Sequence, residues 1–281
     1  MTKTKVLVAV IILLVVLAIW TIWSNSALEL NKYTVESKKL PKAFDGFKIV
    51  QVSDLHNAEM GEDNEKLLAL ISEVKPDIIA ITGDMIDSRR TDVEIALDFA
   101  EEAVKIAPCY YVCGNHELRV KEYDDLKEGL HALGVVILEN EKKSIIKEDQ
   151  EISLIGLNDP SFEAFATYMD EDELIEAYLK PLVEDDNNYK VLLSHRPELL
   201  ETYAEAGVDL ALSGHAHGGQ IRLPIIGGII APHQGLLPEY DGGLYIKEET
   251  SMVVSRGIGN SIFPFRFNNR PEVVLIELNE I

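Results

Sequence analysis

The sequence predicts an α/β domain preceded by an apolar N-terminal helix, and three observations support this expectation. Short β-like apolar runs alternate with segments whose apolar residues recur at helical spacing, which is the pattern of a sheet covered by helices. An unbroken apolar run fills residues 6–20. The 281 residues are enough for one large α/β domain or two small ones, and the regular alternation favours one.

The first element is a predicted membrane-spanning helix. Residues 6–23 form a charge-free stretch of about 18 residues, just long enough to cross a bilayer. Trp20 and Trp23 suit a membrane interface, and Lys3 and Lys5 precede the stretch. Because basic flanks stay cytoplasmic, we expect a single-pass protein of the cell membrane with its domain on the extracytoplasmic side. A cleaved signal peptide is the alternative, although residues 25–27 match a cleavage site poorly.

The later elements follow in order along the chain. We assign residues 1–24 to the anchor, residues 25–44 to a linker with a first strand at 32–35, and residues 45–281 to the folded domain. Val93, Leu97, Ala100 and Val104 illustrate the helical period of the apolar positions. Helices are predicted at 63–74 with Asp63 or Asn64 as its cap, at 92–106, at 123–133 before Gly134, at 169–179 and at 197–206.

The predicted strands fall into two groups. Those of the main sheet are 49–53, 78–82, 109–113, 191–194 and 208–212, with further strands at 135–138 and 152–157. Beyond residue 219 the chain changes to strands punctuated by glycine and proline, which we expect to form a second sheet packed on the first. These later strands are 220–223, 243–246, 252–255 and 272–278.

Charge and cysteine content narrow the classes of partner. The formal net charge is −22, and such an acidic surface repels phosphate backbones, so we expect no nucleic-acid partner. Cys109 and Cys113 lie four positions apart in a predicted strand, roughly 13 Å between Cα atoms, which is too far for a disulfide.

Polar residues that can bind metals stand where predicted strands end. Ligands of open α/β sheets bind at the carboxyl ends of the strands, so these residues are expected to share one pocket. They offer nitrogen and oxygen donors without thiolate, a set that suits Mn, Fe, Zn or Ni. The seven donors fit two ions if one carboxylate bridges them, and such a pair can clamp a phosphoryl group. The set is Asp54, His56, Asp84, Asn115, His195, His215 and His217.

The order of these motifs resembles the calcineurin-like metallophosphoesterases. The motifs are Asp54-x-His56, Gly83-Asp84, Gly114-Asn115-His116-Glu117, His195 and Gly214-His215-x-His217. The likeness spans residues 46–278. The phrases at residues 218–224 and 255–259 are similar to the bacterial membrane-anchored branch called YkuE-like.

The resemblance implies a four-layer α/β/β/α sandwich with two divalent metal ions, Mn, Fe or Zn, with Mn favoured. Carried over by position, it implies that Asp54, His56 and His217 hold one ion, that Asn115, His195 and His215 hold the other, and that Asp84 bridges. It further implies that a metal-bridging hydroxide attacks phosphorus. The catalytic roles fall to His116, which protonates the leaving oxygen, and to Asp87, which orients His116. Arg89 and Arg90 lie near the family's arginine position but are offset, so we assign them no phosphate.

The expected function is therefore hydrolysis of a phosphoester. Lipid-linked or nucleotide diphosphates at the membrane, small phosphomonoesters and cell-wall phosphodiesters all remain open as substrates. A general phosphodiesterase is one alternative, and a non-catalytic metal-binding surface module is another. A nuclease shares the metal ligands, but the acidic charge counts against it.

The aromatic loop at residues 258–267 has two interpretations. Ile262, Phe263, Phe265 and Phe267 lie close together there, beside Arg266. These side chains either close the core or dip into the lipid interface.

Overall fold

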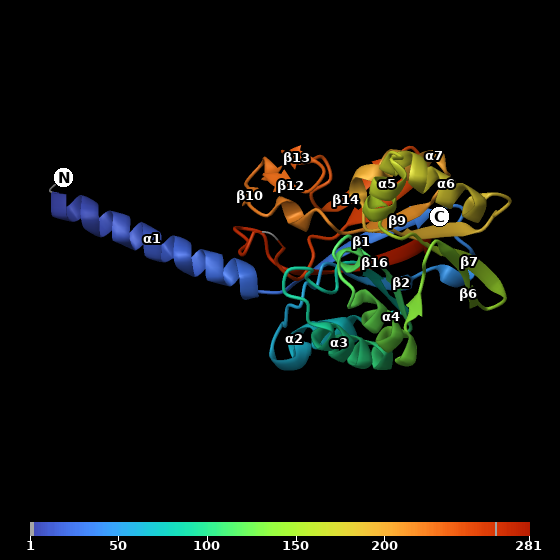
Figure 1. Cartoon of the computed structure of the whole chain (residues 1–281), viewed down its shortest axis with the longest axis horizontal. Coiled ribbons are helices and arrows are strands. Elements are labelled where there is room, and N and C mark those ends of the chain that lie inside the picture. The colour runs from blue at the N-terminus through green and yellow to red at the C-terminus, as the bar shows by residue number, and fades with distance from the viewer. Residues whose placement is uncertain (1–2, 262) are drawn as a thin grey trace.

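Two six-stranded sheets face each other, and helices cover the outer face of each (Figure 1). This computed structural model describes residues 3–261 and 263–281. The four layers confirm the expected α/β/β/α sandwich. Ile262, one member of the aromatic loop, lies outside the described residues.

The first sheet combines parallel strands with strands from both ends of the chain. Strands β2 to β5 are parallel, and β16 lies antiparallel to β2 and parallel to β1. The last predicted strand therefore belongs to the first sheet rather than to the second, because Val274 to Leu278 pair with Phe47 to Gln51. The order is β1 (Glu29–Ser37), β16 (Glu272–Glu280), β2 (Phe47–Val52), β3 (Ile78–Thr82), β4 (Cys109–Val112) and β5 (Val136–Ile137).

The second sheet has a parallel centre and antiparallel edges. Strands β7, β8, β9 and β15 run parallel, whereas β14 and β6 pair antiparallel at the two edges. The order is β14 (Gly243–Lys247), β15 (Thr250–Val254), β9 (Leu210–Ser213), β8 (Tyr189–Leu193), β7 (Gln150–Gly156) and β6 (Glu141–Lys147).

Three apolar cores separate the four layers. One lies between the two sheets and includes Ile49, Val191 and Leu212. A second lies under α2 (Glu65–Val74), α3 (Val93–Ile106) and α4 (Tyr123–Ala132), which cover the first sheet. The third lies under α6 (Glu171–Val183) and α7 (Leu200–Glu205), beside α5 (Ser161–Thr167). The central core fixes how the two sheets meet, and so brings their strand ends together.

Two predicted helix starts have different outcomes. Asp92 caps α3, because its side chain accepts a hydrogen bond from the Glu94 backbone at 3.1 Å. Asn64 precedes α2 but makes no such bond, since its side chain accepts from the Met60 backbone at 2.9 Å instead. Asn64 thus stands at the expected N-cap position of α2, but its side chain makes no capping hydrogen bond.

The N-terminal helix α1 (Lys3–Ser26) projects away from the domain (Figure 1). It is long and apolar enough to cross a membrane, and its most apolar stretch has no contact that buries it. Its last turn is bonded to the loop before β16. Asn25 donates to the Arg266 carbonyl at 2.8 Å and accepts from the Arg266 backbone N–H at 2.8 Å. The helix α1 thus leaves the domain at a fixed place.

Two short two-stranded ribbons follow β9 along the chain. The first pairs β10 (Arg222–Leu223) with β11 (Gly227–Gly228), and the second pairs β12 (Ile230–Ala231) with β13 (Gly235–Leu236). The predicted strand at 220–223 is shorter than expected, because a 3-10 turn over His217–Gly219 precedes it.

Candidate metal centre

The candidate ligands lie on loops that leave parallel strands at one edge of the sandwich. Asp54 and His56 follow β2, Asp84 follows β3, and Asn115 follows β4 in the first sheet. His195 follows β8, and His215 and His217 follow β9 in the second. The structure therefore brings all seven predicted residues to the same edge. All seven side chains belong to buried residues.

The loop backbones are held in an unfavourable conformation. Five of the seven residues have a positive φ, namely Asp54, His56, Asp84, His215 and His217, with values between 47° and 66°. Non-glycine residues adopt this left-handed region at a cost, and such strain gathers at functional sites. The packed cores on either side hold these backbones in place, and the side chains converge on the two clusters described below.

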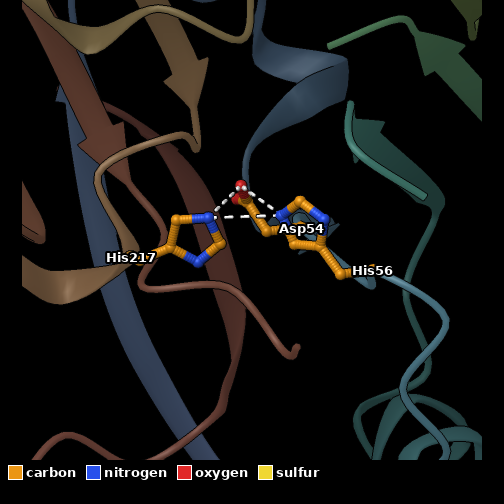
Figure 2. Close-up of side chains that lie close together, drawn as sticks. All are labelled: Asp54, His56 and His217. Carbon is orange, nitrogen blue, oxygen red and sulfur yellow. Dashed lines mark hydrogen bonds and ion pairs between the residues drawn. The ribbon is translucent and has the colours of Figure 1, made fainter. Parts of the chain in front are cut away.

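The first cluster contains Asp54, His56 and His217, which point toward one another in Figure 2. His217 Nε2 lies 3.3 Å from Asp54 Oδ1, and His56 Nε2 lies 3.8 Å from the same oxygen. The two Nε2 atoms are 3.2 Å apart. One carboxylate oxygen and two ring nitrogens therefore face a common centre.

The second cluster contains Asp84, His195 and His215. His195 Nε2 lies 3.2 Å from Asp84 Oδ2 and 3.2 Å from His215 Nδ1. The same Asp84 oxygen lies 3.5 Å from His56 Nε2 of the first cluster. The Asp84 carboxylate thus stands between the two groups.

Asn115 lies in the loop after β4, next to a residue that is bonded to the second cluster. Its neighbour His116 donates a backbone hydrogen bond to Asp84 Oδ1 at 2.8 Å. The Asn115 Oδ1 atom is buried and has no hydrogen-bond partner among the described residues. A buried amide oxygen without a donor is costly unless a cation or another donor meets it.

The charges of the centre match those of a cation site. Burial opposes ionisation, yet His217, His56 and His195 hold the pKa of Asp54 below its ordinary value. His195 and His56 likewise hold the pKa of Asp84 well below its usual range. Burial lowers the pKa of His217 to about 3. With ionised carboxylates and facing ring nitrogens, these residues fit divalent metal ions.

The carboxylates of the centre favour the protonated form of His195. Burial lowers its pKa, but the Asp84 and Asp54 carboxylates outweigh burial and raise the pKa to about 10. Its Nδ1 lies 2.8 Å from the Thr82 carbonyl, so Nδ1 carries a hydrogen and Nε2 faces Asp84. A cation that binds between these carboxylates would replace the proton on Nε2.

His116 lies at the edge of the first cluster. Its ring meets the His56 ring edge-on, with 4.5 Å between centroids. The backbone N–H of Ser88 donates to His116 Nδ1 at 3.0 Å, so the neutral ring carries its hydrogen on Nε2. That Nε2 lies 3.4 Å from Ser261 Oγ. Burial lowers the pKa of His116 to about 4.

Asp87 lies near His116 without bonding to it. Its Oδ1 is 3.9 Å from His116 Nδ1, beyond hydrogen-bond distance. Arg89 occupies the Asp87 carboxylate instead, through its backbone N–H at 2.8 Å and its Nη2 at 2.8 Å. In the structure, Ser88 rather than Asp87 orients the His116 ring.

Glu117 is a site residue that the sequence reasoning passed over. Its buried carboxylate accepts backbone hydrogen bonds from Asp84 at 2.9 Å, Gly114 at 2.7 Å and Ile86 at 3.1 Å. It therefore ties the loop after β3 to the loop after β4. Its position as the last residue of the Gly114-Asn115-His116-Glu117 motif is the sequence feature that could have identified it.

Buried arginines also border the centre. Arg196 is fully buried and donates through Nη2 to Asp159 Oδ1 at 3.1 Å. Its Nη1 lies 2.7 Å from His233 Nδ1, and His233 Nδ1 lies 2.9 Å from His215 Nε2. On the other side, Arg266 Nη2 lies 3.5 Å from His217 Nδ1. Nothing in a single sequence shows that these arginines are buried.

Two cavities open beside the centre. A polar cavity of about 380 Å³ is lined by His56, Arg89, Arg90 and Ser261 among others. A more apolar cavity of about 230 Å³ is lined by Ile230, Pro232 and Phe263, and also by Ser261. Ser261 borders both cavities, and its Oγ lies 3.4 Å from His116 Nε2. Both cavities therefore lie next to His116.

Known proteins resemble this chain in sequence and in fold. The profile described as calcineurin-like phosphoesterase matches residues 47–219. The chain is 31% identical over 261 residues to the uncharacterized metallophosphoesterase YkuE of Bacillus subtilis, covering 89% of this chain and 85% of that protein. It is 29% identical over 238 residues to the phosphodiesterase YaeI of Escherichia coli, covering 83% and 82%.

A solved structure supports the fold alone. The crystal structure of TT1561 from Thermus thermophilus superposes with a TM-score of 0.51 at 13% sequence identity, covering 76% of this chain and 90% of that one. Together with the profile match, these likenesses confirm the expectation drawn from the order of the motifs. The chain belongs to the calcineurin-like phosphoesterase family and is a phosphoester hydrolase.

Proposed function

We propose that the chain hydrolyses phosphoesters with two divalent metal ions held at this edge of the sandwich. Asp54, His56 and His217 hold one ion, and Asn115, His195 and His215 hold the other, with Asp84 shared. The observation that carries this assignment is the position of Asp84 Oδ2, within 3.5 Å of a ring nitrogen in each cluster. The ligands are all nitrogen or oxygen atoms, which suits Mn, Fe or Zn, and the resemblance to the family favours manganese among them.

When bound, two divalent ions would supply positive charge that stabilises the phosphoryl group and lowers the pKa of a water molecule. The protein's own residues fix the positions of the metal ligands and line the cavity next to them. Glu117 fixes the loops that bear Asp84 and Asn115, so the shared carboxylate is rigid before substrate arrives. Arg89 and Arg90 line the polar cavity, and the Asp87 carboxylate lies 2.8 Å from Arg89 Nη2 and 4.0 Å from Arg90 Nη2.

His116 assists departure of the leaving oxygen. With Nδ1 accepting from Ser88, the ring presents Nε2–H, and this atom is directed toward Ser261 at the border of the two cavities. Asp87 influences the ring only through its charge at 3.9 Å. It acts as a positioning residue for Arg89 rather than as a partner of His116.

The substrate is a phosphodiester or diphosphate with an apolar portion, and lipid-linked diphosphates are the first candidates. The polar cavity accommodates the phosphate-bearing part, and the adjoining apolar cavity accommodates the other part. The phosphodiesterase name of the Escherichia coli relative supports a diester over a monoester.

We further propose that residues 1–24 anchor the chain in the cell membrane, that residues 25–44 form the linker and first strand, and that residues 45–281 form the hydrolase domain. The domain lies on the extracytoplasmic side. The uncovered apolar surface of α1 supports the anchor, and Lys3 and Lys5 support the orientation.

A screen of the full chain in detergent tests this function. Protein loaded with Mn, Zn or Fe is assayed against phosphomonoesters, phosphodiesters and lipid diphosphates. We expect hydrolysis of the diester or diphosphate class, lost in Asp84→Asn and retained in Asp124→Asn, whose side chain is exposed on α4. Equal activity in Asp84→Asn and the unaltered chain would refute the shared-carboxylate assignment.

A further inference from the structure

We propose that the turn joining β10 to β11, residues 223–226, is immersed in the lipid bilayer beside α1. This hairpin tip reads Leu-Pro-Ile-Ile and carries no charge. Ile225 is fully exposed, Ile226 is 58% exposed and Leu223 is 39% exposed. Such a contiguous apolar surface requires a partner, and the position of α1 identifies the bilayer as that partner.

The depth of the tip follows from its contact with the anchor. Val16, Leu17 and Trp20 of α1 line a groove of about 280 Å³ whose other wall includes Leu223 and Pro224. Val16 precedes Trp23 by two helical turns, roughly 10 Å at a rise of 1.5 Å per residue. The hairpin therefore runs beside the last apolar turns of the helix rather than beyond its end.

The helix has no spare length that would let the tip stay in water. Its apolar part, residues 6–23, is roughly 27 Å long at that rise, against a hydrocarbon core of about 30 Å. If the helix moved outward until the hairpin tip reached water, Lys3 and Lys5 would enter the hydrocarbon. The level of Val16 to Trp20 must therefore lie within one leaflet, and the hairpin tip lies at that level.

Hydrogen bonds join the tip, the anchor and the metal centre. The Arg222 backbone donates to the Phe267 carbonyl at 3.0 Å, and the Asn268 backbone donates to Ser24 Oγ at 3.2 Å. Asn25 holds Arg266 by two bonds, and Arg266 reaches His217 at 3.5 Å. The immersed tip thus fixes the domain at a second point and holds the centre at the membrane surface.

The neighbouring aromatic loop agrees with this placement. Phe263 and Phe265 are each 40% exposed, so they do not close the core, although Ile258 in the same loop is buried. Their rings pack edge to face with 5.9 Å between centroids. Phe263 also lines the apolar cavity beside Ser261, and Phe267 of the same loop lines the groove that Leu223 and Pro224 share with α1.

The test places a fluorescent reporter at the tip of the full chain in phosphatidylcholine vesicles. An environment-sensitive label is attached in Ile225→Cys, with Ile226→Cys as a second position. Cys109 and Cys113 are buried and stay unlabelled in folded protein. The matched control is Ile146→Cys on β6, 69% exposed and at the end of the domain remote from α1 (Figure 1). Circular dichroism confirms folding of each variant.

We expect the label at position 225 or 226 to be quenched by spin-labelled lipids and protected from aqueous iodide. The label at position 146 should show the opposite behaviour. Quenching by iodide at all three positions would overturn the proposal. Protection from iodide without quenching by spin-labelled lipid would also overturn it, because a second copy of the chain or another protein would then cover the tip.

Discussion

Substitution of His116 by alanine tests how the site assists the leaving group. The Ser88 N–H directed at Nδ1 fixes the hydrogen of the neutral ring on Nε2. With a pKa of about 4, only about one ring in a thousand is protonated at pH 7. Cations bound nearby would lower this pKa further, so His116 acts as a neutral hydrogen-bond donor at physiological pH.

The expected magnitude follows from that role. Removing one buried donor from a developing oxyanion typically lowers kcat by about 10²–10³-fold, or about 2.7–4 kcal/mol. We expect this loss in His116→Ala with an alkyl phosphodiester. We expect a much smaller loss with a nitrophenyl ester, because nitrophenoxide leaves without help. Metal content should be unchanged, since His116 lies outside both ligand sets.

The assay is the ratio of kcat for the unaltered chain to kcat for His116→Ala, measured between pH 6 and pH 8. Taking the ratio cancels the titration of every group the two proteins share. A neutral donor predicts a flat ratio across this range. The matched control is His131→Ala on α4, an exposed histidine, which should leave kcat unchanged.

A ratio that falls tenfold per pH unit would refute this reasoning, because it would show that the imidazolium form transfers a proton. A loss of the same size for both leaving groups would also contradict it.

Three further predictions concern the centre and its supports. Asp84→Asn should lower the metal bound per chain, measured by mass spectrometry, and retention of two ions would contradict the shared carboxylate. Asp159→Asn breaks a buried ion pair with Arg196 and should lower the free energy of unfolding by about 3 kcal/mol, measured by thermal unfolding. This is the low end of the range for such a pair, because Glu198 still lies 3.1 Å from Arg196. An unchanged midpoint would show that the pair contributes nothing. Asn25→Leu should lower the stability by roughly 1 kcal/mol per lost hydrogen bond, and faster proteolysis near residue 266 should accompany it.

The arrival of these seven residues at one edge of the sandwich could be predicted because their signal is local. Each follows an apolar run that ends abruptly, and parallel strands bring such ends to one edge of the sheet. The short distance of Asp84 from both groups follows from that arrangement. The role of Asp87 could not be read in the same way, because a neighbouring backbone N–H and Arg89 compete for the same atoms.

Some parts of the fold could not be predicted from the sequence, and each has a physical reason. Strand β6 is exposed and carries three lysines, so it reads as a loop, although lysines are common on edge strands. Strand β16 has an ordinary strand pattern, but pattern alone does not select its neighbours. The burial of Arg196 and Arg266 depends on groups remote in sequence, such as Asp159 and the Gly259 carbonyl.

The pairing of β16 between β1 and β2 governs when the first sheet can assemble. Gln51 of β2 must wait for Val274, roughly 220 residues further along the chain, and contacts of such long sequence separation form slowly. Meanwhile α1, which is synthesised before the strands of the domain, can already enter the bilayer if it serves as the proposed anchor. Strand β1, tethered directly behind it, has no partner until β16 emerges, and its unpaired edge then stands close to the lipid. The first sheet is therefore completed only when β16, near the C-terminal end, pairs with β1 and β2 near the N-terminal end. Until then its unpaired strands are exposed to aggregation.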